Sequence, residues 1–322
     1  MDQFAMTSTQ DWLIVAPVEH VSDTEPVAIS SGGYDFALFR DDGGAVKAVE
    51  NRCPHRRVPL TQGKIIKGAI RCAYHGWTFD GSTGSCIQVP NLGEQERVPP
   101  NLRVTAFSVV EHLGFVCIWV GDGDNPGLPP FQASSTLGVK SESYGSGTTC
   151  LSVNDYRNIL FDAPNLLFEI PGVRLTDFYL GDVDTDGASV SVDREAEWGE
   201  ACKPANIKSV DRPLILRTKH CIGVNKVRYE LMTDSETVLA TLSLAYSESR
   251  RGTTRYCWRF CRYAEFHRHQ PSKYRMRFRR RDPVKVFDSL DGDAIATALV
   301  GPSADLAVLS ELELSAFDGS LA

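Results

Sequence analysis

The sequence CPHRRVPLTQGKIIKGAIRCAYHGW occupies residues 53–77 and contains two short pairs of potential metal ligands. Cys53 and His55 form the first pair, Cys72 and His75 form the second, and sixteen residues separate His55 from Cys72. Side chains two apart in an extended segment point to the same side, so one hairpin loop can present Cys53 and His55 together. Two such loops that face each other would bring two thiols and two imidazoles to one centre.

Two kinds of metal centre use this set of ligands. Zinc binds two cysteines and two histidines in structural sites, but these ligands usually come as a pair of cysteines and a pair of histidines. Here each loop contributes one ligand of each kind. That arrangement favours a [2Fe–2S] cluster in which one iron takes both thiolates and the other takes both imidazoles.

The surrounding sequence predicts an α+β protein with two domains. Short hydrophobic runs flank the turn sequences DDGG at 41–44, KG at 67–68 and GSTG at 81–84, which predicts an all-β hairpin domain. A passage rich in Gly, Pro and Ser at 121–136 predicts the boundary, dividing the chain into residues 1–125 and 126–322.

The second domain has a different pattern. A helical pattern runs up to Pro164, which should end or kink the helix. Four long alternating runs follow between residues 214 and 266, which predicts one large antiparallel sheet. An antiparallel sheet that wraps a helix would enclose a pocket.

Composition restricts the partners and the compartment. The chain has 322 residues, 42% of them hydrophobic, and a formal charge of −7, which argues against a general surface for nucleic acid or anionic membrane. Nine cysteines without a disulfide pattern favour a reducing compartment. No window has the about 20 apolar residues of a membrane span, and the N-terminus lacks a basic leader, so we expect a cytoplasmic protein. The one basic run, at 275–281, is interpreted as a solvated face or a docking site for an acidic partner such as a reductase.

The motifs resemble those of a known family. CPH at 53–55 and CAYHGW at 72–77 are similar to the two ligand loops of a Rieske domain. Phe79-Asp80, Gly84 and Pro90 continue the pattern of Rieske-type ring-hydroxylating and demethylating oxygenases. The resemblance implies a [2Fe–2S] cluster that receives electrons from a ferredoxin or a flavin reductase. More weakly, it extends over the second domain, which resembles the family's helix-grip domain.

The same resemblance implies a second metal site, and there the sequence departs from the family. In the oxygenases a mononuclear iron(II) is held by two histidines and one carboxylate, and the histidines belong to a motif similar to Asp-x-x-His-x4-His. On this chain Asp162 falls on the aspartate, Asn165 and Ile170 fall on the two histidines, and Asp282 lies near the third ligand. Isoleucine cannot ligate iron and an amide oxygen is a weak ligand for it, so we expect no mononuclear iron in this chain. Asp282, followed by Pro283, also fits the N-cap of a helix.

Other roles remain open for the polar residues of the second domain. Asp155, Asn158, Asp162 and Asn165 are spaced by three or four residues, as on one face of a helix. They predict a polar network at a domain or subunit contact, or an oxygen-ligand site suited to Mg²⁺ or Ca²⁺. The histidines His220, His267 and His269 are alternative iron ligands or ordinary surface residues; the last two are expected at a strand end.

The sequence therefore predicts an electron-relay component of a Rieske-type oxygenase. Its cluster would feed a second oxygenase subunit that carries iron, within a trimer or mixed hexamer, for monooxygenation (hydroxylation or demethylation) of a small organic substrate. The resemblance places Asp162 at the contact between subunits. One alternative is a self-sufficient terminal oxygenase with atypical iron ligands. Another is a non-enzymatic small-molecule-binding or scaffold protein with a structural cluster.

Overall fold

The computed structural model describes residues 12–93, 96–121, 127–129, 131, 138–185, 189–199, 213–221, 224–249 and 252–271. The basic run at 275–281 and the helix predicted from Asp282 lie outside these residues. The chain divides into two compact units. The first unit extends to Ala133 and includes two later segments, Tyr246–Arg251 and Arg255–Cys257, and the second contains the rest.

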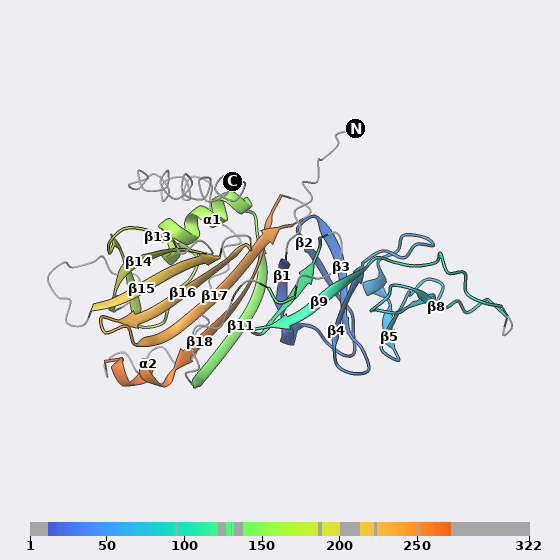
Figure 1. Cartoon of the computed structure of the whole chain (residues 1–322), viewed down its shortest axis with the longest axis horizontal. Coiled ribbons are helices and arrows are strands. Elements are labelled where there is room, and N and C mark those ends of the chain that lie inside the picture. Colours follow the sequence, from blue (N-terminus) through green and yellow to red (C-terminus); the bar gives the residue numbers. More distant parts are fainter. Residues whose placement is uncertain are drawn as a thin grey trace. The chain divides into compact units, whose positions relative to one another are not determined.

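Two antiparallel sheets form the first unit (Figure 1). The larger sheet has the strand order β1-β10-β9-β4-β3-β2, and the smaller has the order β5-β6-β7-β8. The strands are β1 (Trp12–Pro17), β2 (Val27–Ser31), β3 (Tyr34–Arg40), β4 (Val46–Glu50), β5 (Lys64–Ile66), β6 (Ala69–Arg71), β7 (Thr78–Phe79), β8 (Cys86–Gln88), β9 (Ala106–His112) and β10 (Phe115–Trp119). Two short 3-10 helices, Val18–His20 and Leu60–Gln62, lie between them.

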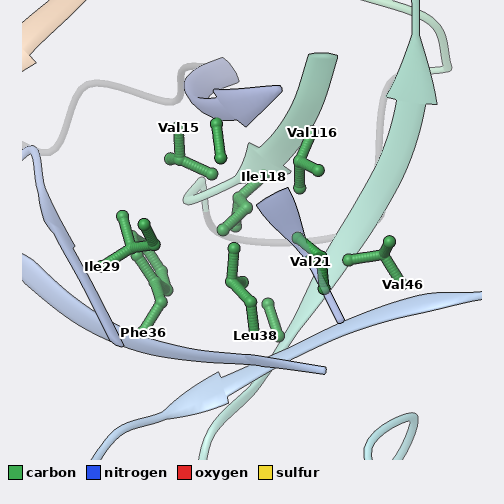
Figure 2. Packing of buried hydrophobic residues seen from close by; sticks show 10 residues of the cluster. Val15, Val21, Ile29, Phe36, Leu38, Val46, Val116 and Ile118 are labelled. Atoms are coloured by element: carbon green, nitrogen blue, oxygen red, sulfur yellow. The ribbon is translucent and has the colours of Figure 1, made fainter. Parts of the chain in front are cut away.

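Strand β3 joins two hydrophobic clusters because its side chains alternate between the faces of the sheet. Phe36 and Leu38 belong to one cluster, in which Figure 2 shows them close to Val15 and Ile118. Ala37 and Phe39 belong to the other cluster, which also contains the buried cysteines of the two ligand loops. Burying a Phe or Leu side chain contributes about 2 kcal/mol. The side chains of β3 that pack in the second cluster therefore help to hold the two ligand loops in place.

The second unit is an eight-stranded sheet with two helices (Figure 1). Its main strand order is β11-β18-β17-β16-β15-β14-β12, with β13 paired to β14. Its elements are β11 (Val139–Thr149), α1 (Val153–Asp162), the 3-10 helix η3 (Pro164–Leu166), β12 (Val173–Tyr179), β13 (Asp184–Thr185), β14 (Ser189–Trp198), β15 (Pro213–Cys221), β16 (Lys226–Thr233), β17 (Val238–Glu248), β18 (Thr254–Tyr263) and α2 (Ala264–His269). The four alternating runs seen in the sequence are β15 to β18, which are neighbours in one sheet as predicted.

Helix α1 begins and ends where local chemistry dictates. Ser152 is the N-cap: its Oγ accepts the N–H of Asp155 at 3.1 Å and donates to the Asp155 carboxylate at 2.7 Å. The helix ends at Asp162, two residues before Pro164, in agreement with the sequence prediction. No described helix is long and apolar enough to cross a membrane.

One face of the large sheet packs on α1. Tyr229, fully buried on β16, donates a hydrogen bond to the carbonyl of Leu160 at 2.6 Å. Arg194 on β14 and Tyr179 on β12 both donate to the carbonyl of Phe161, at 3.1 and 3.2 Å. The last carbonyls of a helix have no partner within the helix, so these side chains supply the missing donors. We call this side of the sheet the α1 face.

Candidate metal centre

The first ligand loop connects β4 to β5, and two backbone hydrogen bonds of Cys53 hold it together. The N–H of Cys53 donates to the carbonyl of Val58 at 2.9 Å, and the N–H of Arg57 donates to the carbonyl of Cys53 at 2.8 Å. Arg57 has a φ of 57°, in the left-handed region that favours glycine.

The second ligand loop connects β6 to β7 and repeats this backbone pattern. The N–H of Cys72 donates to the carbonyl of Trp77 at 2.9 Å, and the N–H of Gly76 donates to the carbonyl of Cys72 at 3.1 Å. Gly76 has a φ of 71° and takes the place that Arg57 has in the first loop. A Cβ atom at Gly76 would lie 2.9 Å from Cγ of Pro90, so both the backbone and the packing require glycine.

The two cysteines lie in the interior. Cys53 and Cys72 are 2% and 3% exposed and pack in the cluster that contains Phe39 and Ile70. Burial raises the pKa of the Cys53 thiol to about 11, and the neighbouring Cys72 thiol adds to this rise. The free Cys53 thiol is therefore held protonated, and a metal must displace its proton to bind.

The two histidines lie at the surface. The rings of His55 and His75 have centroids 4.6 Å apart, and both residues are exposed. Trp77 stacks on His55 with a centroid distance of 4.6 Å and an interplanar angle of 3°. Trp77 lies in the ligand motif, but its stacking role was not predicted from the sequence. The contact fixes the plane of one imidazole.

The structure thus brings all four predicted ligands together as two like pairs. In a Rieske [2Fe–2S] centre, one iron is bound by two thiolates and the other by two imidazoles. The buried thiol pair and the exposed imidazole pair match these two sets of ligands. The residues present fit that cluster.

The positions that the resemblance assigns to a mononuclear iron have a different character. Asn165 is exposed in η3, and Ile170 is buried at 3% exposure. Asp162 is the last residue of α1, but its side chain lies outside the description, as does Asp282. Within the described residues, no three His, Cys, Asp or Glu side chains are grouped to hold a single metal ion.

The polar face predicted along α1 is only partly present. Asn165 lies beyond the helix, because the chain turns into η3 after Asp162. Asp155 belongs to the N-terminal cap, and seven residues of helix place it roughly 10 Å along the axis from Asp162. The prediction that all four residues share one helical face is therefore wrong for Asn165.

The remaining histidines also differ from expectation. His267 and His269 lie in α2 and not at a strand end, and the ring of His269 contacts the carbonyl of Glu265 at 3.0 Å. Residues two apart on a helix do not share a side, so these two histidines do not form a ligand pair. His220 lies buried on β15 against Phe161, with ring centroids 5.6 Å apart. Burial, helped by the charge of Arg157, lowers its pKa to about 4.

Arg194 was not singled out from the sequence. It is 2% exposed and donates to the carbonyls of Phe161 and Thr176 and to the hydroxyl of Tyr179, at 3.1, 2.9 and 2.8 Å. A signal was present: Arg194 has the same parity along its strand as Val190, Val192 and Ala196, which are all buried.

Comparison with known proteins agrees with this centre. Residues 11–106 match the Rieske [2Fe-2S] domain family. The chain is 41% identical over 119 residues to the oxidoreductase NdmD of Pseudomonas putida, which is 37% of this chain and 20% of NdmD. It is 37% identical over 123 residues to the oxygenase component of dicamba O-demethylase from Stenotrophomonas maltophilia, which is 37% of this chain and 35% of that protein. The matches thus span about a fifth and a third of these two relatives.

The fold likeness reaches further along the chain. A crystal structure of dicamba monooxygenase with non-heme iron and dicamba superposes with a TM-score of 0.61, at 18% identity. The superposition covers 93% of this chain and 87% of that one. The family match identifies residues 11–106 as a Rieske [2Fe–2S] domain. Over most of its length the chain shares the fold of that Rieske-type non-heme iron oxygenase structure.

Proposed function

We propose that this chain is the electron-relay component of a Rieske-type monooxygenase. In this proposal Cys53 and Cys72 bind one iron of the cluster, and His55 and His75 bind the other. The observation that carries it is the pairing of two buried thiols with two exposed imidazoles. When bound, a cluster of this type accepts and passes on single electrons at a potential that a ferredoxin or flavin reductase can reach.

The residues of the loops have distinct tasks in such a relay. The buried cysteines keep one end of the centre away from water, and the exposed imidazoles offer the shortest path to a partner protein. The outer ring nitrogen of His55 or His75 can release a proton, which couples electron transfer to proton transfer. Trp77 holds the ring of His55 in one plane during this exchange.

Charge around the centre supports electron entry from an acidic partner. Residues 51–80 contain six Lys or Arg and a single carboxylate, although the whole chain has a net charge of −7. Arg56, Arg57, Lys64 and Lys67 are exposed. A positive surface around an electron-transfer centre speeds the encounter with a negatively charged protein. The docking role first expected for residues 275–281 stays a prediction.

The proposed destination of the electrons is a mononuclear iron on a second oxygenase subunit. Asn165 and Ile170 supply no imidazole at the positions that the family uses. Arg194 supports this proposal too, because a buried positive charge opposes the binding of a metal cation beside it. Its guanidinium donates to the carbonyl of Phe161, the residue before Asp162. Asp162 would then serve at the contact between subunits, and Asp282 would remain a helix cap.

The proposed assembly is a trimer or mixed hexamer in the cytoplasm. The reaction is a monooxygenation, either hydroxylation or demethylation, of a small organic molecule. Dicamba O-demethylase, whose oxygenase component is among the relatives, carries out a reaction of this type by its name.

The test separates the relay from catalysis. The purified chain should contain two irons and two sulfides, show a Rieske EPR signal, and be reduced by a ferredoxin or flavin reductase. Product should form only after addition of an oxygenase chain that keeps both histidines of Asp-x-x-His-x4-His. Turnover by this chain and a reductase alone would refute the division of labour, whereas a cluster that no reductase reduces would favour the scaffold alternative.

A complete oxygenase with atypical ligands is a second candidate. It is favoured by His220, whose buried imidazole lies against Phe161 on the α1 face and is held neutral, the form that binds metals. This candidate predicts a third iron per chain that is lost in His220→Ala while the [2Fe–2S] signal remains.

A further inference from the structure

Three side chains form a row across the smaller sheet of the first unit. Arg71, the last residue of β6, lies opposite Thr78 on β7, and Thr78 lies opposite Gln88 on β8. The neighbours Ile70 and Phe79 are buried in the cluster that contains the two cysteines. Side chains alternate along a strand, so the row lies on the other side of this sheet. We call these three residues (Arg71, Thr78 and Gln88) the Arg71 row.

Hydrogen bonds connect the Arg71 row to the second ligand loop. Nε of Arg71 donates to Oγ1 of Thr78 at 3.1 Å, and Nη2 of Arg71 donates to Oε1 of Gln88 at 2.7 Å. The Thr78 hydroxyl, which is buried, donates in turn to the carbonyl of Gly76 at 3.2 Å. Two consecutive hydrogen bonds therefore link the guanidinium to the residue that follows His75.

The positive charge of Arg71 has a fixed place and no carboxylate partner in the described part of the chain. Its two side-chain hydrogen bonds go to a hydroxyl and to an amide oxygen, which are both neutral acceptors. Arg40 in the same unit differs, because it forms an ion pair with Glu111 at 2.9 Å. The Arg71 charge is thus held at the base of the second ligand loop without being neutralised by these contacts.

A fixed positive charge near a cluster of this type favours its reduced form. Two ferric ions, two sulfides, two thiolates and two neutral imidazoles have no net charge together, and one added electron gives the centre a negative charge. A positive charge nearby stabilises that added negative charge, and the net charge around a cluster is one of the factors that set its potential.

We propose that Arg71 raises the reduction potential of the cluster, and that Thr78 and Gln88 hold its charge in place. The exposed Arg56 and Arg57 would meet a partner protein, whereas Arg71 acts on the centre itself and needs no partner. Because Arg71 is partly exposed, solvent and salt screen its charge, so the effect is modest. The inference rests on the cluster ligands of the proposed function, but not on electron transfer to a second subunit.

The test is a redox titration of the whole protein with its cluster bound, with dithionite as the reductant and the Rieske EPR signal as the readout. Arg71→Met and Arg71→Gln should each lower the equilibrium constant for one-electron reduction about threefold, which is about 28 mV at about 59 mV per tenfold change. Arg71→Gln removes the charge but keeps hydrogen-bond donors. Arg71→Lys keeps the charge and should stay within about 1.5-fold of the unmodified chain.

The matched control is Arg103→Met. Arg103 is exposed and donates to the carbonyl of Thr83, in the turn between β7 and β8, and not to a ligand loop. Its loss should change the equilibrium constant by less than about 1.5-fold, because solvent screens an exposed charge. Thr78→Val removes the hydroxyl that holds the guanidinium and should lower the constant by less than Arg71→Met does. Thr78→Ser, which keeps the hydroxyl, should leave it unchanged.

Two results would overturn this inference alone. One is an unchanged potential in Arg71→Gln with an intact Rieske signal, and the other is an equal fall in Arg71→Lys and Arg71→Met. Absence of a Rieske signal in the unmodified chain would overturn the cluster assignment together with this inference. Neither a reductase nor a second oxygenase subunit takes part, so a failed electron relay would not affect the measured potentials.

Discussion

The ligand loops of the first unit and the end of α1 in the second are the two places where the family resemblance predicts metal ligands. In the loops all four ligand residues are present and lie together as two like pairs. After α1 the polypeptide keeps the fold, but the positions that the resemblance assigns to the two histidines hold an exposed Asn165 and a buried Ile170. Sequence identity to NdmD and dicamba O-demethylase is confined to about a third of the chain, whereas the fold likeness covers 93% of it.

The proposed loss of the mononuclear iron would mean that a fold and its metal site are specified separately. The sheet of the second unit depends on many alternating apolar residues, each of which tolerates replacement by a similar side chain. A mononuclear site depends on three side chains, so two substitutions remove it without disturbing the sheet.

The largest expected effect comes from removing a cluster ligand. Cys72→Ser should abolish the Rieske EPR signal and bring the iron content close to zero, because an alcohol does not replace a thiolate on iron. Asn165→Ala is the matched change in the second unit and should leave the iron content unchanged, since the side chain is exposed. Loss of iron in Asn165→Ala would break the comparison between the two units.

The next effect concerns the buried charge of the second unit. Arg194→Met should lower the free energy of unfolding by roughly 3 kcal/mol, because the buried carbonyl of Thr176 loses the Arg194 donor and the carbonyl of Phe161 keeps the Tyr179 donor but loses that of Arg194. Urea denaturation followed by circular dichroism measures this loss. Arg217→Met removes a partly exposed ion pair with Asp193 and should cost less than about 1 kcal/mol. Equal losses in the two variants would contradict the structural role of Arg194.

The stability of the second unit should depend on pH through His220. Its folded pKa of about 4 lies below the ordinary value of 6.5, so the unfolded state takes up the proton first. The stability is fully present above pH 6.5 and falls as the pH drops toward 4, by about 3 kcal/mol.

Urea midpoints between pH 7 and 4 measure this dependence. His220→Phe should remove the His220 contribution to the slope, whereas His267→Phe, an exposed histidine on α2, should keep it. If the slope is unchanged in His220→Phe, other groups govern the acid sensitivity.

The smallest effect compares the two ligand loops with each other. Arg57 and Gly76 occupy equivalent left-handed positions, but only the second loop has glycine there. Arg57→Gly should raise the free energy of unfolding by about 1 kcal/mol, because glycine adopts this conformation without steric cost. Gly76→Ala should lower it by more, since the new Cβ would also approach Pro90. A loss of stability in Arg57→Gly would show that the Arg57 side chain has a structural role of its own.

The sequence alone predicted the four candidate cluster ligands, and it determined strands β15 to β18 of the large sheet and the end of α1. Each depends on short-range chemistry: the spacing of Cys and His within two tight loops, the alternation of apolar residues, and the missing N–H of Pro164. These signals do not require the rest of the molecule.

Only the tertiary structure decided which polar residues are buried and what they contact. Alternation shows that Arg194 shares a side with apolar neighbours, but not that this side faces α1 or that Arg194 finds carbonyl acceptors there. The same applies to His220, buried against Phe161, and to His269, which lies in a helix where a strand end was expected. The physical reason is that burial and hydrogen bonding depend on strands and helices far apart in the sequence, whose pairing no local pattern specifies.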